Sequence, residues 1–189
     1  MSINPPISEK DLYEALVQMA DALARLKANY AVIGGMATGY RSQPRFTKDL
    51  DFLLVIPQLV LPGLLEDLKQ RGFDFDTEVV IREWIQEHMT VLSFRGIRID
   101  WLKPVIPAYF HILDRATEEP WLKQPIRVAS AEGLILLKLL AFRTQDLVDI
   151  ENLVAAHEHL DLDWIKTEWQ TVAGLDDPRM LRLLELIRG

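Results

Sequence analysis

A pair of adjacent glycines and two carboxylates lie within one short stretch of this sequence. The stretch reads Gly34-Gly35-Met-Ala-Thr-Gly-Tyr-Arg41-Ser-Gln-Pro-Arg45-Phe-Thr47-Lys48-Asp49-Leu50-Asp51. Residues i and i+2 of a strand share one face about 6.6 Å apart, so Asp49 and Asp51 can converge on a magnesium ion. Because glycine has no Cβ, the backbone N–H groups of Gly34 and Gly35 can approach an anion closely. Together these residue types predict a site for a metal-bound triphosphate.

The Asp-x-Asp spacing alone is weak evidence, because it occurs twice more in the chain. The other copies are Asp74 to Asp76 and Asp161 to Asp163. They lie near an expected strand start and an expected helix start, where turn and N-cap roles are common for aspartate. The first copy differs because the glycine pair precedes it and a strongly apolar strand follows it. We therefore interpret only Asp49 and Asp51 as functional.

A third carboxylate is expected near the first two. Residues 93–98 read as a hairpin turn that joins an extended segment at 88–94 to another at 97–102. Apolar and polar residues alternate in the second segment, which places Asp100 on the face opposite its apolar neighbours. If this strand lies beside the strand expected at 50–56, Asp100 completes a carboxylate triad. The alternative is an exposed polar position on a strand.

The last third of the sequence has a helical pattern with one lysine inside an apolar run. Lys138 interrupts the pattern that begins at Ser130. A buried lysine without a partner is costly, so its ammonium group either reaches solvent or meets a fixed anion, and a phosphate suits the second case. Arg143, Asp146 and Asp149 are three residues apart, so these charges can share a helix face. They form either an accessory part of the site or a structural ion-pair network.

Hydrophobic periodicity indicates alternating strands and helices in the N-terminal part of the sequence and helices alone in the C-terminal part. The expected strands cover 30–33 and 50–56, and the expected helices cover 8–27, 35–40 and 62–70. Ser8 is expected to cap the first helix, which has these residues on one face: Leu12, Leu16, Met19, Leu23 and Leu26. Residues 73–81 look extended, although 79–87 also fit a helix in part. The pattern predicts an α/β (α+β) fold with a mixed central sheet and flanking helices. We expect an α/β core over residues 1–129 and a C-terminal helical segment at 130–189 packed on it.

Composition and charge limit the classes of function. Of 189 residues, 49% are hydrophobic and 26% are charged, which is ordinary for a globular enzyme. The absence of cysteine suits a reducing compartment. Because no signal peptide and no membrane-spanning run is indicated, we expect a cytoplasmic protein without a membrane partner. The net charge of -7 argues against a general affinity for nucleic acid, so any such contact must be local.

Over roughly residues 30 to 155 these motifs resemble the nucleotidyltransferase fold, specifically its AbiEii-type abortive-infection branch. The likeness rests on Gly34-Gly35, Arg45-x-Thr47-x-Asp49-Leu50-Asp51, Asp100, Lys138, Arg143, Asp146 and Asp149. It implies that Asp49, Asp51 and Asp100 are catalytic and hold two Mg²⁺ ions, for which Mn²⁺ can substitute. It also implies a nucleoside triphosphate bound by Gly34, Gly35, Arg45, Thr47, Lys48 and Lys138.

By this resemblance the chain is expected to transfer a nucleoside monophosphate to an RNA or protein hydroxyl and to release pyrophosphate. Its expected role is that of a component of a toxin-antitoxin or phage-defence pair, with the toxin as the first hypothesis and a cognate antitoxin or toxin as partner. Two alternatives stay open: an antitoxin-like transferase that modifies a partner protein, and a nucleotide-binding module without turnover. The sequence specifies neither the nucleobase nor the acceptor.

Overall fold

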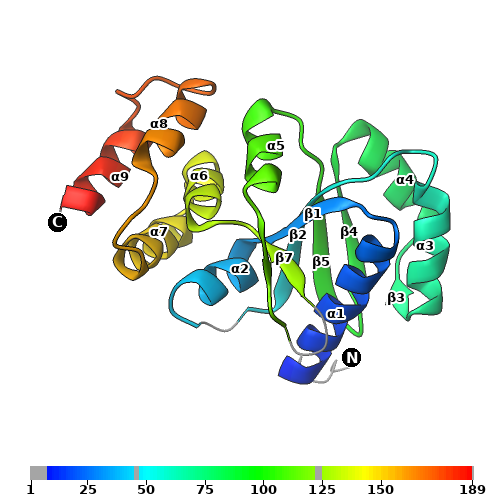
Figure 1. The fold of residues 1–189 in the computed structure, drawn as a ribbon. Coiled ribbons are helices and arrows are strands. Elements are labelled where there is room, and N and C mark those ends of the chain that lie inside the picture. The colour runs from blue at the N-terminus through cyan, green and yellow to red at the C-terminus, as the bar shows by residue number, and fades with distance from the viewer. Residues whose placement is uncertain (1–7, 45–46, 122–124, 189) are drawn as a thin grey trace.

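The computed structural model describes residues 8–44, 47–121 and 125–188, which form a mixed sheet with helices around it (Figure 1). The strands are β1 Asn29–Ile33, β2 Asp49–Val55, β3 Phe73–Asp74, β4 Met89–Phe94, β5 Ile97–Leu102, β6 Thr117–Glu119 and β7 Ile126–Val128. Across the sheet their order is β3-β4-β5-β2-β1-β7-β6. Strand β2 is parallel to β5 and antiparallel to β1, while β1 is parallel to β7. The predicted α/β (α+β) fold with a mixed central sheet is confirmed.

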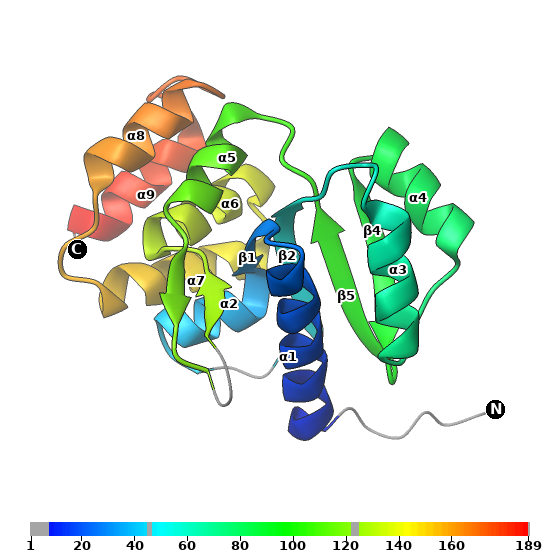
Figure 2. The same cartoon turned by 45° about the vertical axis from the view of Figure 1, so that its right-hand side comes forward.

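Helices surround the sheet and continue beyond it at the C-terminal side. They are α1 Glu9–Arg25, α2 Gly34–Arg41, α3 Leu61–Gln70, α4 Thr77–Gln86, α5 Pro107–Asp114, α6 Ala131–Ala141, α7 Thr144–Ala156, α8 Leu162–Gln170 and α9 Pro178–Arg188. Figure 2 shows α3 and α4 beside β4, and α6 to α9 as a group at the other side of the molecule. The predicted division into residues 1–129 and 130–189 stays a prediction. No helix in the described ranges is both long and apolar enough to cross a membrane.

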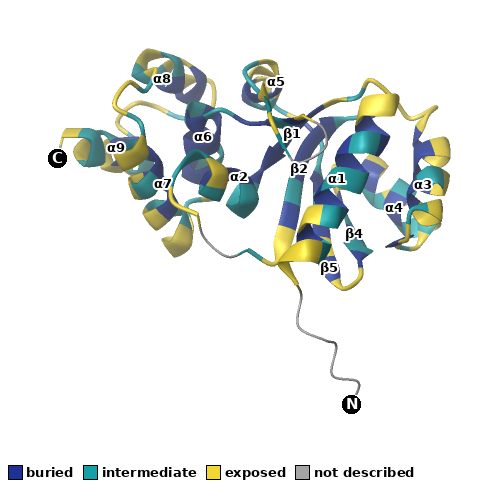
Figure 3. Ribbon diagram, turned by 60° about the horizontal axis from the view of Figure 1, so that its bottom comes forward, coloured by how far each residue is buried: buried dark blue, intermediate teal, exposed yellow. Residues whose placement is uncertain are grey.

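The first helix follows the predicted pattern closely. The Ser8 side chain accepts a hydrogen bond from the Asp11 N–H and caps α1, as its position indicated. The predicted apolar face is buried at Leu12, Leu16, Met19 and Leu23. Leu26, which we expected on the same face, lies at the C-cap and is 40% exposed. In Figure 3 buried residues concentrate on the central strands and on the helix faces turned towards them.

The expectation of an extended segment over 73–81 is wrong beyond Asp74, whereas the partly helical alternative for 79–87 is confirmed by helix α4. Helix α4 begins at Thr77, because the Asp76 carboxylate accepts hydrogen bonds from the N–H groups of the next turn. Val80 and Trp84, four residues apart, are both buried and fix the helical choice. Asp161 likewise caps α8. Both later Asp-x-Asp copies thus contain a helix cap, as interpreted from the sequence.

The helical pattern from Ser130 is divided into two helices. Ser130 caps α6 as its position suggests, but Phe142 takes a left-handed conformation with φ 48° and ends this helix. Arg143 then precedes α7, and its N–H donates to the Asp146 carboxylate at 2.9 Å. The change of direction brings the start of α7 back alongside α6 (Figure 1).

Candidate active site

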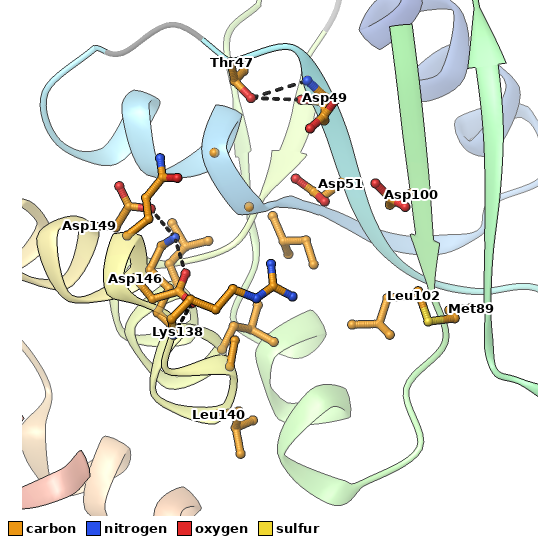
Figure 4. Close-up of a pocket in the computed structure, with 18 of the residues that line it drawn as sticks. Thr47, Asp49, Asp51, Met89, Asp100, Leu102, Lys138, Leu140, Asp146 and Asp149 are labelled. Carbon is orange, nitrogen blue, oxygen red and sulfur yellow. Dashed lines mark hydrogen bonds and ion pairs between the residues drawn. The ribbon is translucent and has the colours of Figure 1, made fainter.

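The parallel pairing of β2 with β5 brings three carboxylates to one part of the sheet. Asp51 lies opposite Asp100 in this register, and Asp49 lies opposite Arg98. Asp49 is exposed, whereas Asp51 and Asp100 are half-buried. Figure 4 shows the side chains of Asp51 and Asp100 next to each other on adjacent strands. The predicted neighbourhood of these two strands is therefore confirmed, and the triad is assembled by strand register.

The glycine pair packs directly against the Asp51 carboxylate. Gly34 has φ +62°, a left-handed conformation that residues with a side chain rarely adopt, and a Cβ there would overlap Oδ2 of Asp51. The Gly35 N–H, at the N-terminal end of α2, donates a hydrogen bond to the Asp51 carboxylate. Glycine is thus required for the close approach of α2 to a carboxylate of this chain. Binding of a triphosphate by Gly34 and Gly35 stays a prediction.

Replacing Gly34 with alanine is expected to displace Asp51 and to lower the free energy of unfolding by about 1–3 kcal/mol, through backbone strain and overlap. Urea unfolding measures the loss, and thermal melting with and without magnesium shows whether the metal response disappears with it. Gly63→Ala is the matched control, because nothing lies within 4 Å of its Cβ position and alanine favours the helix. Equal stability and equal magnesium response in Gly34→Ala and wild type would contradict this role.

The pKa of Asp51 is strongly shifted from its ordinary value. Burial raises the pKa of its carboxyl from 3.8 to about 6, and repulsion by Asp100 and Asp49 adds to the increase. The Gly35 N–H and the Lys138 ammonium group oppose this shift of the pKa. At neutral pH the ionised carboxylates therefore repel one another in a partly desolvated place, and a cation between them would lower the energy.

Asp100 is held by an arginine of its own strand. Arg98 donates from Nε to Oδ2 at 2.8 Å and from Nη2 to Oδ1 at 2.6 Å, a bidentate pair. Within the described ranges, no three acidic or histidine side chains already surround a point where a cation could bind. The donor set nevertheless fits magnesium or manganese, because carboxylate oxygens are their preferred ligands. Each oxygen of Asp100 keeps a second lone pair, so the Arg98 pair orients this carboxylate without excluding it as a ligand.

Lys138 meets carboxylates of the next helix. Its Nζ lies 2.5 Å from Oδ2 of Asp149 and 3.5 Å from Oδ1 of Asp146, and the lysine is only 7% exposed. The expectation that this ammonium group meets a fixed anion agrees with the structure, but the anions are aspartates of the chain. The ion-pair network that we left open for Asp146 and Asp149 is present (Figure 4). A phosphate contact for Lys138 stays a prediction.

The other predicted phosphate ligands lie in different surroundings. The Thr47 hydroxyl lines the pocket and makes a local turn with the backbone of Asp49 (Figure 4). Lys48 is exposed and is not part of the pocket lining that the structure describes. Arg45 lies outside the described residues. Arg143 lines the pocket, is exposed, and makes no ion pair through its guanidinium with any described residue.

The glycine pair, the three carboxylates of the sheet, Thr47, Lys138 and Arg143 border one pocket of about 690 Å³, within the usual size range for ligand sites. One end holds the carboxylates and the glycine pair. Figure 4 shows Met89, Leu102 and Leu140 away from Asp49 and Asp51, and we call this part of the pocket, whose lining also includes Tyr109 and Leu137, its apolar end. Sequence reasoning missed the apolar end, although one signal was present: Leu102 follows Asp100 by two residues and so shares its strand face.

Neither a protein-family model nor a curated protein matches this sequence. Similar solved structures include an antigenic nucleotidyltransferase-like protein from Paracoccidioides brasiliensis, with a TM-score of 0.55, 17% identity and coverage of 96% of this chain and 95% of that one. Lincomycin-bound LnuA, a lincosamide antibiotic adenylyltransferase, has a TM-score of 0.51 and 16% identity, covering 80% of this chain and 99% of its own. ANT(2")-Ia in complex with adenylyl-2"-tobramycin has a TM-score of 0.53 and 12% identity, and the match covers 83% of this chain and 94% of that one. The chain therefore has the nucleotidyltransferase fold, while its assignment to the AbiEii-type branch stays a prediction.

Proposed function

We propose that this protein is a metal-dependent nucleotidyltransferase that moves a nucleoside monophosphate from a nucleoside triphosphate to an acceptor hydroxyl and releases pyrophosphate. The observation that carries the proposal is the register that sets Asp51 of β2 beside Asp100 of β5. The glycine pair that seats Asp51, and a fold shared with nucleotidyltransferases, support the same conclusion.

The charge of the pocket supports a need for divalent cations. Its described lining has five carboxylates and three cationic groups: Asp49, Asp51, Asp100, Asp146, Asp149, Arg98, Lys138 and Arg143. Two of the cations, Arg98 and Lys138, are already paired with aspartates. A triphosphate would be repelled by this surplus of negative charge unless cations entered with it. We therefore propose two Mg²⁺ ions, with Mn²⁺ as a substitute.

Each carboxylate has a role in this proposal. Two bound magnesium ions would stabilise the attacking and the leaving oxygens together. Asp49 and Asp51 would hold them from β2, and Asp100 would complete the site and accept the proton of the attacking hydroxyl. Arg143, which lines the pocket, would offset charge on the leaving pyrophosphate, together with the predicted phosphate ligands Arg45, Thr47, Lys48 and Lys138.

The biological role in this proposal comes from the resemblance alone. An RNA or protein acceptor, a place in a toxin-antitoxin or phage-defence pair, and a cognate partner all stay predictions, as do the antitoxin-like and non-catalytic alternatives. Two of the similar structures hold lincomycin and adenylyl-2"-tobramycin, so in those proteins the fold serves small molecules. A small-molecule acceptor is therefore a second candidate, and the apolar end of the pocket favours it.

Transfer of label from each of the four α-³²P-labelled nucleoside triphosphates tests the proposal. We expect magnesium-dependent labelling of an acceptor in cell lysate that disappears on addition of EDTA and returns with magnesium or manganese. The double variant Asp49→Asn/Asp51→Asn should lose at least about 100-fold in rate. Asp163→Asn is the control, because its side chain is 98% exposed on α8. Undiminished labelling by the double variant would exclude the proposed mechanism.

A further inference from the structure

The pocket changes from polar to apolar along β5. Arg98, Asp100 and Leu102 alternate onto one face of the strand, each about 6.6 Å beyond the last. Leu102 pairs across the ladder with Met89 of β4, which is 45% exposed. Figure 4 shows Leu102 and Met89 together, with Asp100 further along the same strand. An acceptor whose hydroxyl reaches Asp100 would therefore lay its next few atoms over these two side chains.

Helices complete the apolar end from the opposite side. Leu137 and Leu140 of α6 and Tyr109 of α5 are half-buried and line the pocket. The Tyr109 hydroxyl has no hydrogen-bond partner among the described residues, and burial raises its pKa. We call these five side chains the apolar wall: Met89, Leu102, Tyr109, Leu137 and Leu140. The wall offers apolar surface on two sides and one hydroxyl that is free to bond a ligand.

Charge separates the classes of acceptor that this wall could receive. No member of the apolar wall carries a charge, and Arg143 is the single unpaired cation among the described residues that line the pocket. The whole chain has a net charge of -7. An RNA end brings a phosphate with each nucleotide, and binding it depends on lysines and arginines that this end does not supply. A neutral molecule with an apolar body has no such requirement.

We infer that the acceptor is a small, uncharged hydroxyl compound whose apolar body binds the apolar wall while its hydroxyl lies at Asp100. This inference rests on the proposed function and narrows its acceptor. The acceptor oxygen forms a bond to the α-phosphorus, and the bond from the α-phosphorus to its bridging oxygen breaks. Pyrophosphate leaves with that electron pair, and the hydroxyl proton passes to Asp100. The Tyr109 hydroxyl would bond a polar group of the acceptor.

Binding of two probe compounds tests the inference without any turnover. Saturation-transfer NMR is recorded with cyclohexylmethanol, a neutral alcohol with an apolar body, and with ribose 5-phosphate, a hydroxyl compound with an anionic group. We expect saturation of cyclohexylmethanol by the wild type and by Leu181→Gln, a control at an exposed leucine of α9. Met89→Gln/Leu140→Gln should bind it about fivefold or more weakly, because two apolar contacts are lost. Equal binding by all three proteins, no binding by the wild type, or stronger binding of ribose 5-phosphate would overturn the inference.

The acceptor class is then read from labelled lysate separated into RNA, protein and molecules below about 3 kDa, the last being far smaller than a protein domain. Label in the low-mass fraction, reduced in Met89→Gln/Leu140→Gln but not in Leu181→Gln, supports the inference. Label on RNA or protein overturns it and leaves the proposed transferase intact. If no fraction is labelled, the proposed function fails, and the saturation experiment alone supports or overturns the apolar acceptor site.

Discussion

Replacing Asp51 with asparagine is expected to lower activity and to raise stability at neutral pH. Asparagine keeps the shape of the side chain, and its carbonyl oxygen can still accept the Gly35 N–H. It cannot supply the charge that would hold a divalent cation between β2 and β5, so transfer should fall at least about 100-fold. The same substitution removes a carboxylate that is repelled by Asp100 and Asp49 in a partly buried place.

The pH at which the stability gain appears follows from the pKa of Asp51. The folded protein binds this proton with a pKa of about 6, above the value of 3.8 for an unperturbed aspartate. The contribution of Asp51 to stability is therefore fully present below about pH 3.8 and is lost as pH rises through about 6. Above that pH the free energy of unfolding of the wild type is lower by up to about 3 kcal/mol, and Asp51→Asn does not undergo this loss.

Urea unfolding in EDTA at pH 4, 5, 6, 7 and 8 measures this difference. We expect the two unfolding curves to lie close together at pH 4, to separate progressively between about pH 4 and pH 6, and to keep a nearly constant difference at pH 7 and 8, with Asp51→Asn the more stable protein. Magnesium should then stabilise the wild type at pH 8 and leave Asp51→Asn almost unchanged, since only the wild type retains the ligand. Asp163→Asn, on the solvent-exposed side of α8, should follow the wild type throughout. A lower stability of Asp51→Asn at pH 8 would show that the carboxylate is not under electrostatic strain.

The carboxylate triad could be predicted because each part of it depends on a local pattern. Alternation fixes which face Asp49, Asp51 and Asp100 occupy, and the hairpin at 95–96 fixes the direction of β5. The remaining step, that β5 lies beside β2, depends on topology rather than on a local pattern, and the strand order confirms it. The glycine pair was also recognised, but its contact with Asp51 depends on how closely α2 approaches β2, which no local pattern contains.

Three features were not specified by local sequence patterns, for different physical reasons. The β-branched residues Val79, Val80 and Ile81 favour a strand, and only the Asp76 cap with the burial of Trp84 makes this segment helical. The end of α6 has neither glycine nor proline, because Phe142 itself takes the left-handed conformation. The apolar wall combines residues of β4, β5, α5 and α6, so its existence depends on tertiary packing.

Lys138→Met is expected to destabilise the fold strongly. It removes the ammonium group that Asp149 and Asp146 share. Both carboxylates stay behind in largely buried surroundings, with side chains that are 3% and 14% exposed. Removing one partner of a buried pair leaves charge without compensation and costs about 3–5 kcal/mol in the free energy of unfolding. Lys166→Met is the control, since its pair with the exposed Asp163 spans 3.8 Å at the surface and should contribute less than about 1 kcal/mol.

The triple variant Lys138→Met/Asp146→Asn/Asp149→Asn separates a structural role of the lysine from a phosphate contact. Neutral amides need no buried cation, so most of the lost stability should return in urea unfolding. Because the ammonium group is already held by aspartates, we also expect the triple variant to bind magnesium and a triphosphate within about threefold of the wild type in calorimetry, a difference below about 0.7 kcal/mol. Restored stability with affinity still reduced tenfold or more would instead show that Lys138 contacts the phosphates, and that the aspartates hold it in position for them.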